Sequence, residues 1–252
     1  MWFPVISAIV TLILTASFAV PTYFLTGFKD LKEVNPMVGY PLLFAFYFLS
    51  YFVVIFFNAA LITCAHDSLM GRPTSFGQGM ANAGKHLPAI LGWAFISATV
   101  GVIIRTIAER TGIVGQIVVG IFGAAWNIVT FFVVPVIVVE DGSPVAALKK
   151  SGSMLKRTWG ENVIGNAGIG IVLFLAAMAP IPLVVLGFAS GSMVAGVALA
   201  AVAVLYWIAL SVVGASLSGV YQTALYVYAE TGATPAGFTP EYISGAFVPK
   251  KK

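Results

Sequence analysis

The residues that could do chemistry at a protein site are few in this chain of 252 residues. Its two histidines, His66 and His86, flank a polar segment; Asp67 follows the first of them, and Glu140 is a further oxygen donor. A bound zinc ion needs at least three such ligands held close together. Polar residues at a membrane–water boundary need no such partner, so we predict no metal site.

Sequence motifs for catalysis are missing as well. There is no nucleophile elbow, no H-E-x-x-H zinc motif, no phosphate-binding loop and no Rossmann fingerprint. Gly168 and Gly170 lie inside an apolar stretch, where closely spaced glycines favour helix packing. We therefore predict a non-enzymatic protein with no catalytic or cofactor-binding residues, and a membrane-embedded enzyme stays a minor alternative.

Amide side chains are the polar groups expected at membrane depth. Asn58 and Gln222 occupy equivalent places in two similar segments, and Asn127 lies one to two turns before the corresponding place in a third. Such groups commonly form hydrogen bonds between helices. They could instead line a narrow neutral pathway or hold a lipid headgroup. Prolines in the same apolar segments add kinks that open space between helices, namely Pro21, Pro135, Pro180 and Pro182.

The elements that position these residues are membrane spans. Hydrophobic residues make up 60% of the chain and charged residues 9%, with a mean hydropathy of +0.99, whereas soluble domains carry about 25% charged residues. A spanning helix needs about 20 apolar residues. Six stretches qualify: 4–27, 39–65, 88–107, 113–139, 163–188 and 193–229. We predict an all-α polytopic membrane protein, one transmembrane domain over 1–252, with a single tilted sixth helix and a C-terminal tail at 230–252.

The distribution of lysine and arginine predicts the orientation of these spans. With six spans both termini lie on one side, together with the second and fourth loops. That side holds nine of the thirteen basic residues, against four on the other side. Because basic loops stay in the cytoplasm, we predict a multi-pass protein of a prokaryotic inner (plasma) membrane with both termini cytoplasmic. The net charge of +4 then suits anionic lipid headgroups and not nucleic acid.

Three similar segments indicate an internal repeat. Spans two, four and six are each followed by a Gly-x-Pro or Gly-x-x-Pro turn, at Gly71–Pro73, Gly142–Pro144 and Gly232–Pro235. Glycine readily ends a helix in the left-handed conformation, and proline suits the first position of the next helix. We predict three helical hairpins of one design, with amphipathic interfacial helices at about 74–87 and 143–159 on the cytoplasmic side.

The second interfacial helix is the clearest candidate for an interaction surface. Its apolar residues recur every three or four positions, and its cations fall on the other side: Lys149, Lys150, Lys156 and Arg157. Such a helix lies in the headgroup plane with its cations toward anionic lipid. We predict that these four residues contact anionic headgroups or a cytoplasmic partner, although the helix could simply anchor the hairpins.

The segment Val133–Trp159, which reads VVPVIVVEDGSPVAALKKSGSMLKRTW, carries a family resemblance. It is similar to the signature of a broad group of uncharacterised prokaryotic six-helix integral membrane proteins, related to the membrane domain found beside some glycerophosphoryl diester phosphodiesterases. The resemblance runs from Trp2 to Phe238. It implies a six-helix fold and no catalytic residues, since the phosphodiesterase part of those enzymes is a separate soluble domain. Relatives usually have a basic amphipathic segment before the first span, whereas this sequence opens almost inside that span.

Two further patterns concern helix packing. The second span is bulky and aromatic over Phe44–Phe52, which predicts contact with lipid or a hydrophobic partner. On the sixth span, small residues such as Gly196, Ala200, Ala203 and Gly214 form a stripe. Such a stripe lets backbones approach closely, either within the bundle or between protomers.

These features favour a non-enzymatic integral membrane protein that organises lipid or a membrane protein complex, as a homo-oligomer or as a subunit of that complex. The alternative is a channel or carrier for a neutral or lipid-like substrate. A pathway needs a continuous polar-lined cavity between the spans, whereas an organising protein can pack solidly.

Overall fold

A computed structural model describes residues 2–26, 36–158, 165–235 and 237–238 of the chain. These residues form ten α-helices. The helices are α1 (Trp2–Thr26), α2 (Pro36–Leu69), α3 (Phe76–Lys85), α4 (Leu87–Arg110), α5 (Ile113–Val129), α6 (Val133–Glu140), α7 (Pro144–Thr158), α8 (Gly165–Met178), α9 (Ile181–Ala189) and α10 (Met193–Thr231).

Six segments are long and apolar enough to cross a membrane. Four are single helices: α1, α2, α4 and α10. The other two are broken, because α5 and α6 share the segment Gly115–Glu140, and α8 and α9 share Gly170–Ala189. The prediction of an all-α chain with six spans is confirmed.

Both broken spans are interrupted near prolines. Proline has no N–H, so the carbonyl four residues earlier loses its helical partner. Pro135 has this effect on the Phe131 carbonyl between α5 and α6, and Pro180 has it on the Ala176 carbonyl near the end of α8. The Ala176 carbonyl accepts instead from the Ala179 amide at 3.2 Å and from the Tyr206 hydroxyl of α10 at 2.9 Å. A side chain of α10 therefore supplements the backbone at the second proline.

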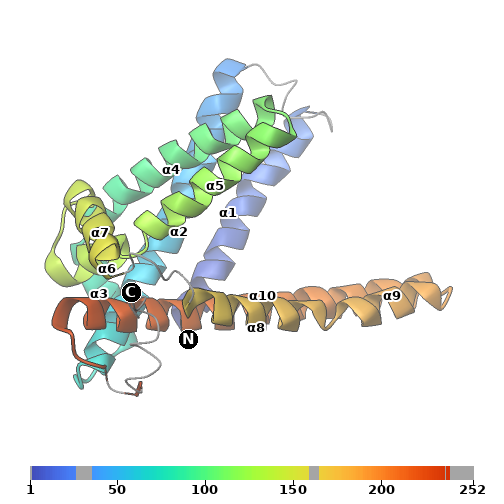
Figure 1. Cartoon of the computed structure of the whole chain (residues 1–252). Coiled ribbons are helices and arrows are strands. Elements are labelled where there is room, and N and C mark those ends of the chain that lie inside the picture. The colour runs from blue at the N-terminus through green and yellow to red at the C-terminus, as the bar shows by residue number, and fades with distance from the viewer. Residues whose placement is uncertain (1, 27–35, 159–164, 236, 239–252) are drawn as a thin grey trace.

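Helix α10 connects two parts of the molecule. Figure 1 shows α1, α2, α4 and α5 as a bundle, with α8, α9 and α10 forming a hairpin that extends away from it. The 39 residues of α10 span about 58 Å at about 1.5 Å per residue, roughly twice the ~30 Å hydrocarbon core of a bilayer. Its N-terminal half packs on α8 and α9, while its C-terminal half packs on α2.

The small residues of α10 serve contacts within this chain. A Cβ added at Gly196 would lie 2.4 Å from the Phe188 ring of α9, and one at Gly214 would lie 3.0 Å from Leu173 of α8. Both glycines therefore let α8 and α9 pack closely on α10. The sequence allowed this stripe to pack within the chain or between protomers, and these two positions pack within the chain.

Helix α2 is central to the bundle, where the sequence predicted a span facing lipid or a partner. It packs against α1, α3, α4, α6 and α10. Its aromatic residues stack with neighbours, as in the edge contact of Phe44 with Phe95 of α4. The aromatic stretch Phe44–Phe52 is half-buried between these helices, so contact with lipid on its remaining surface stays a prediction.

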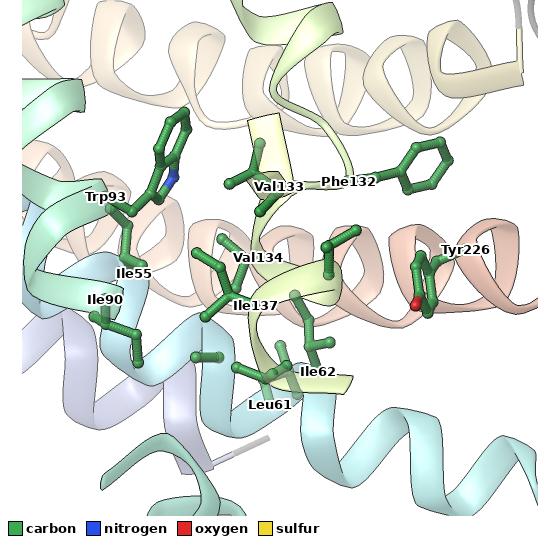
Figure 2. Close-up of a cluster of buried hydrophobic side chains, with 14 of the residues drawn as sticks. Ile55, Leu61, Ile62, Ile90, Trp93, Phe132, Val133, Val134, Ile137 and Tyr226 are labelled. Atoms are coloured by element: carbon green, nitrogen blue, oxygen red, sulfur yellow. The ribbon is translucent and has the colours of Figure 1, made fainter. Parts of the chain in front are cut away.

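The core lies where the ends of α2, α4, α6 and α10 meet. Figure 2 shows Val134 and Ile137 of α6 between Ile90 of α4 on one side and Tyr226 of α10 on the other. Ile137, Ile90 and Ile62 of α2 are fully buried. Burying such a side chain contributes about 1.5–3 kcal/mol, so this crossing is the best-packed part of the fold.

The turns after spans two, four and six use different left-handed residues. Gly71 and Gly232 have φ of +72° and +71°, as the sequence predicted for a glycine that ends a helix. After α6, however, the left-handed residue is Asp141, with φ of +55°, and Gly142 is not. Aspartate tolerates this conformation better than most residues. Ser143 then accepts a hydrogen bond from the Ala146 amide at 3.4 Å and caps α7 as expected.

Candidate functional site

The break between α5 and α6 is held by two side chains from other helices. The Phe131 carbonyl, which Pro135 deprives of its helical donor, accepts a hydrogen bond from Nε2 of Gln222 on α10. An unpaired carbonyl in a membrane interior costs several kcal/mol. Gln222 therefore acts here as a substitute for a backbone amide, and this contact fixes α10 against the broken span.

Ser151 of α7 closes the same break from another direction. Its hydroxyl accepts from the Phe132 amide at 3.0 Å and donates to the Val129 carbonyl at 2.6 Å. The Val129 carbonyl ends α5 and the Phe132 amide lies in the turn before α6, and Ser151 itself is fully buried. One hydroxyl thus satisfies a donor and an acceptor that the helix interruption exposes.

Four side chains from three helices form a charged cluster, which we call the Lys150 cluster. Lys150 Nζ of α7 lies 2.6 Å from Glu140 Oε2 at the end of α6, and 3.2 Å from Glu230 Oε1 of α10. The buried Tyr226 hydroxyl of α10 donates to the other Glu140 oxygen. The cluster contains one ammonium and two carboxylates. It therefore ties α6, α7 and α10 together through a single cation.

The electrostatics of this cluster favour the charged form of Lys150. Burial by itself lowers the pKa of Lys150, but hydrogen bonds and attraction from Glu140 and Glu230 outweigh burial and leave the pKa above its usual value of 10.5. The Lys150 side chain is 33% exposed, and solvent screens such a pair. The cluster consequently gives α7 its position more than it gives the fold stability.

His86 and Asp141 link the turn after α6 to the junction of α3 and α4. His86 Nδ1 lies 2.7 Å from the Asn82 carbonyl oxygen, and its Nε2 lies 2.6 Å from Asp141 Oδ1. Both neighbours are acceptors, so both ring nitrogens can donate only when the imidazole carries two protons. The left-handed Asp141 thus places its carboxylate against His86, which links the end of α6 to the α3–α4 junction.

Asn82 also joins three helices. Its Nδ2 donates to Thr63 Oγ1 of α2 at 2.9 Å and to the Val138 carbonyl of α6 at 3.1 Å. The Val138 carbonyl is one of the last four of α6, which have no helical donor. Asn82 of α3 therefore caps α6 while it holds α2 alongside.

A cavity of about 360 Å³ opens between the ends of α2, α3 and α6. The polar side chains in its lining are Thr63, His66, Asp67, Arg72, Gln78, Asn82 and Lys85. Arg72 Nη2 lies 2.8 Å from Asp67 Oδ1 and 3.2 Å from His66 Nδ1. Since a guanidinium only donates, His66 Nδ1 accepts, and the neutral ring carries its proton on Nε2.

The two histidines do not share a site with Glu140. His66 contacts Arg72, His86 contacts Asp141, and Glu140 belongs to the Lys150 cluster. Across the described ranges 2–26, 36–158, 165–235 and 237–238, no three His, Cys, Asp or Glu residues group closely enough to hold a metal ion.

The three predicted amides are only partly brought together. Gln222 is half-buried at the broken span, and Asn58 is half-buried on α2, with its Oδ1 beside Gly219, one turn before Gln222 on α10. The Asn127 side chain is exposed on α5. Asn58 and Gln222 thus lie along the α2–α10 contact, whereas Asn127 points away from the packed interior.

The four predicted cations of α7 differ in their surroundings. Lys149 and Lys156 are exposed, while Lys150 is held by two carboxylates. The backbone of Arg157 belongs to α7, and its side chain lies outside the described part of the structure. We call the end of the molecule formed by α3, α7 and the end of α6 the basic end, because its exposed cations include Arg72, Lys85, Lys149 and Lys156.

Several of these residues were not identified from the sequence: Ser151, Asn82, Tyr226 and Glu230. A proline within a span does signal a carbonyl that needs a new donor four residues earlier. The sequence does not reveal which distant side chain supplies that donor, because the answer depends on which helices pack together.

Comparison with known families identifies one match. Residues 37–238 match a model described as Family of unknown function (DUF6159). The match covers most of the chain and includes every side chain of the site described above. No curated protein and no solved structure matches the chain.

Proposed function

This chain belongs to that family of unknown function, and from the geometry of its basic end we propose that it is a non-enzymatic integral membrane protein that organises anionic lipid. The observation that carries the proposal is a contrast at the basic end. The ends of α2, α6 and α10 pack tightly against one another there, beside the cavity at α3, and exposed cations surround that packing. Solid packing favours an organising protein over a conduit, and exposed cations beside a membrane favour anionic headgroups.

The distribution of charge supports the orientation that we propose. Exposed Lys149 and Lys156 lie on α7, and Arg72 and Lys85 flank α3, so four cations gather at one end of the spans. Basic residues near span ends favour the cytoplasmic side. In this proposal both termini are cytoplasmic, the membrane is a prokaryotic inner membrane, and α3 and α7 lie in the headgroup plane as the linkers of three related hairpins.

The channel or carrier alternative has less support. Gln222, which would line the pathway, already donates to the Phe131 carbonyl, and Asn127 is exposed on the outside of α5. One turn after Asn58 on α2, Ile62 is fully buried, as is Leu225 of α10, so the helices pack without a polar route there. The carbonyls freed by the prolines therefore accept hydrogen bonds from other side chains, and they do not line a conduction pathway.

A lipid titration tests the proposal. The double variant Lys149→Gln/Lys156→Gln removes two exposed cations of α7 and leaves the Lys150 cluster intact. Because each cation near an anionic surface contributes about 1 kcal/mol, we expect roughly fivefold weaker retention of phosphatidylglycerol per lysine at low salt. The measurement is native mass spectrometry of the protein in mixed phosphatidylglycerol–phosphatidylcholine nanodiscs.

The matched control is Arg105→Gln/Arg110→Gln, which removes two cations at the opposite end of α4. This control is expected to leave retention at the basic end unchanged. Equal phosphatidylglycerol retention by the wild type and the α7 variant would contradict the lipid proposal. A stoichiometric protein partner that dissociates from that variant would contradict it in favour of a membrane protein complex.

A further inference from the structure

The cavity between α2, α3 and α6 has a chemistry that the α7 surface lacks. It is a concave site of about 360 Å³, near the lower end of the volumes of small-molecule pockets. Its wall is polar, and it lies where α2 leaves the apolar core. A cavity of this size and place can bind the headgroup of one lipid molecule, whereas a broad charged surface such as that of α7 contacts many lipids.

Two cations in the cavity wall define what it attracts. Arg72 follows the turn at the end of α2, and Lys85 is the last residue of α3. The single carboxylate in the lining, Asp67, is already paired with Arg72 Nη2 at 2.8 Å. With His66 neutral, the lining has one negative and two positive charges. The surplus is positive, which favours an anion.

Asp67 and His66 also orient the guanidinium. Both of the Arg72 contacts found among the described residues are made by Nη2, so Nη1 and Nε keep their N–H groups for a ligand. These N–H groups diverge from each other, so Arg72 offers a phosphate single hydrogen bonds from Nη1 or Nε together with its positive charge. Lys85 adds a point charge, and Gln78 adds an amide that can donate.

An exposed apolar side chain lies close to Arg72 along the chain. Met70, two residues before Arg72, is 49% exposed. An exposed apolar side chain beside a phosphate-binding group fits an amphiphile better than a soluble anion, because acyl chains can cover it.

We propose that this cavity binds the phosphate ester of a single anionic phospholipid, with Arg72 and Lys85 as the phosphate-binding residues. This inference rests on the proposed function only for the class of ligand. It adds a specific site with one occupant, separate from the exposed lysines of α7.

Native mass spectrometry of the full chain tests this site. The protein is delipidated in detergent and titrated separately with phosphatidylglycerol, phosphatidylcholine and inorganic phosphate. For the wild type we expect the first phosphatidylglycerol to bind at least tenfold more tightly than phosphatidylcholine. The variant Arg72→Gln/Lys85→Gln is expected to lose this preference, while Lys149→Gln/Lys156→Gln is expected to keep it.

The arms of the experiment separate the outcomes. An unchanged preference in Arg72→Gln/Lys85→Gln, with that variant eluting as a monodisperse peak, would overturn the cavity site and leave the α7 proposal standing. A different result would overturn the lipid as occupant: inorganic phosphate binds the wild type at millimolar concentration and does not bind Arg72→Gln/Lys85→Gln, while the wild type shows no preference between the two lipids. That result would favour a soluble phosphate ester. The single variants Arg72→Lys and Lys85→Arg keep the charge, so both are expected to keep the preference for phosphatidylglycerol. Loss of that preference in both variants would contradict attraction by charge at this cavity.

Discussion

The break in the fourth span can be tested through one hydroxyl. Replacing Ser151 with alanine removes a single oxygen atom from a fully buried position. The Phe132 amide then loses its acceptor at 3.0 Å, and the Val129 carbonyl loses its donor at 2.6 Å. Because the helix is interrupted between Val129 and Phe132, with the Val133 amide bonded to the Thr130 carbonyl, no neighbouring helical hydrogen bond can replace them without a backbone shift.

The expected magnitude follows from these two orphaned groups. A buried backbone group without its partner costs about 1–3 kcal/mol, while hydrogen bonds between membrane helices contribute about 0.6 kcal/mol on average and about 1.7 kcal/mol at most. We therefore expect Ser151→Ala to lower the free energy of unfolding by about 2–4 kcal/mol, near the upper limit of two such bonds.

The assay is equilibrium unfolding in mixed micelles of a mild detergent and dodecyl sulfate. Ser153→Ala is the matched control on the same helix. The Ser153 side chain is exposed, and its hydroxyl donates only locally, to the Lys150 carbonyl at 2.8 Å. The control should change the free energy by less than about 0.5 kcal/mol, as surface substitutions do. If Ser151→Ala matches this control, the hydroxyl does not stabilise the break, and our account of the fourth span is wrong.

Further predictions concern the same region. Lys150→Met is expected to cost about 1 kcal/mol, because two carboxylates lose their shared cation, while Lys149→Met is expected to be neutral in the same unfolding assay. Because the pKa of Lys150 is raised in the folded protein, charged Lys150 adds to the free energy of unfolding below pH 10.5. This addition is lost as the pH rises through the higher folded-state pKa. The difference in free energy of unfolding between the wild type and Lys150→Met should therefore shrink at alkaline pH. Gly79→Ala is expected to destabilise the fold by about 1–3 kcal/mol, because its Cβ would lie 2.7 Å from a backbone oxygen of α2. Gly84→Ala is expected to stabilise the fold by about 0.5–1 kcal/mol, because the space around its Cβ is open. Gln222→Leu removes the amide donor at the broken span and is expected to cost about 1–3 kcal/mol, the cost of one buried backbone group without its partner. No loss of stability would contradict its capping role.

The two proline breaks explain how α10 gains its place. Each break leaves a carbonyl without its helical donor, at Phe131 and at Ala176, and α10 supplies a donor to both, through Gln222 and Tyr206. These contacts lie far apart along one helix. They fix both the rotation and the register of α10 against the other spans, a task that uniform apolar packing does poorly.

Equivalent-looking residues acquired different roles through tertiary contacts. Lys149 and Lys150 are neighbours in the sequence and were predicted to contact the same lipid surface. In the fold Lys149 is exposed, while Lys150 lies between Glu140 and Glu230. A helix turns by about 100° per residue, so adjacent lysines face different surroundings, and only packing determines which one meets the carboxylates.

The sequence by itself determined that this is a six-span all-α protein. The length and apolarity of each segment are local properties, and a segment of about 20 apolar residues has few alternatives to a membrane helix. Local turn chemistry was also readable, as in the Ser143 cap and the left-handed Gly71.

Only the tertiary structure decided which side chains complete the breaks and how the site is formed. The donor for the Phe131 carbonyl lies 91 positions away along the chain, and the partner of Glu140 on α10 lies 86 positions away. The central place of α2 was equally invisible, because an aromatic surface packs well against lipid and against helices. The hydrophobic effect drives an apolar side chain out of water, but it has no direction and does not determine which neighbour the side chain contacts.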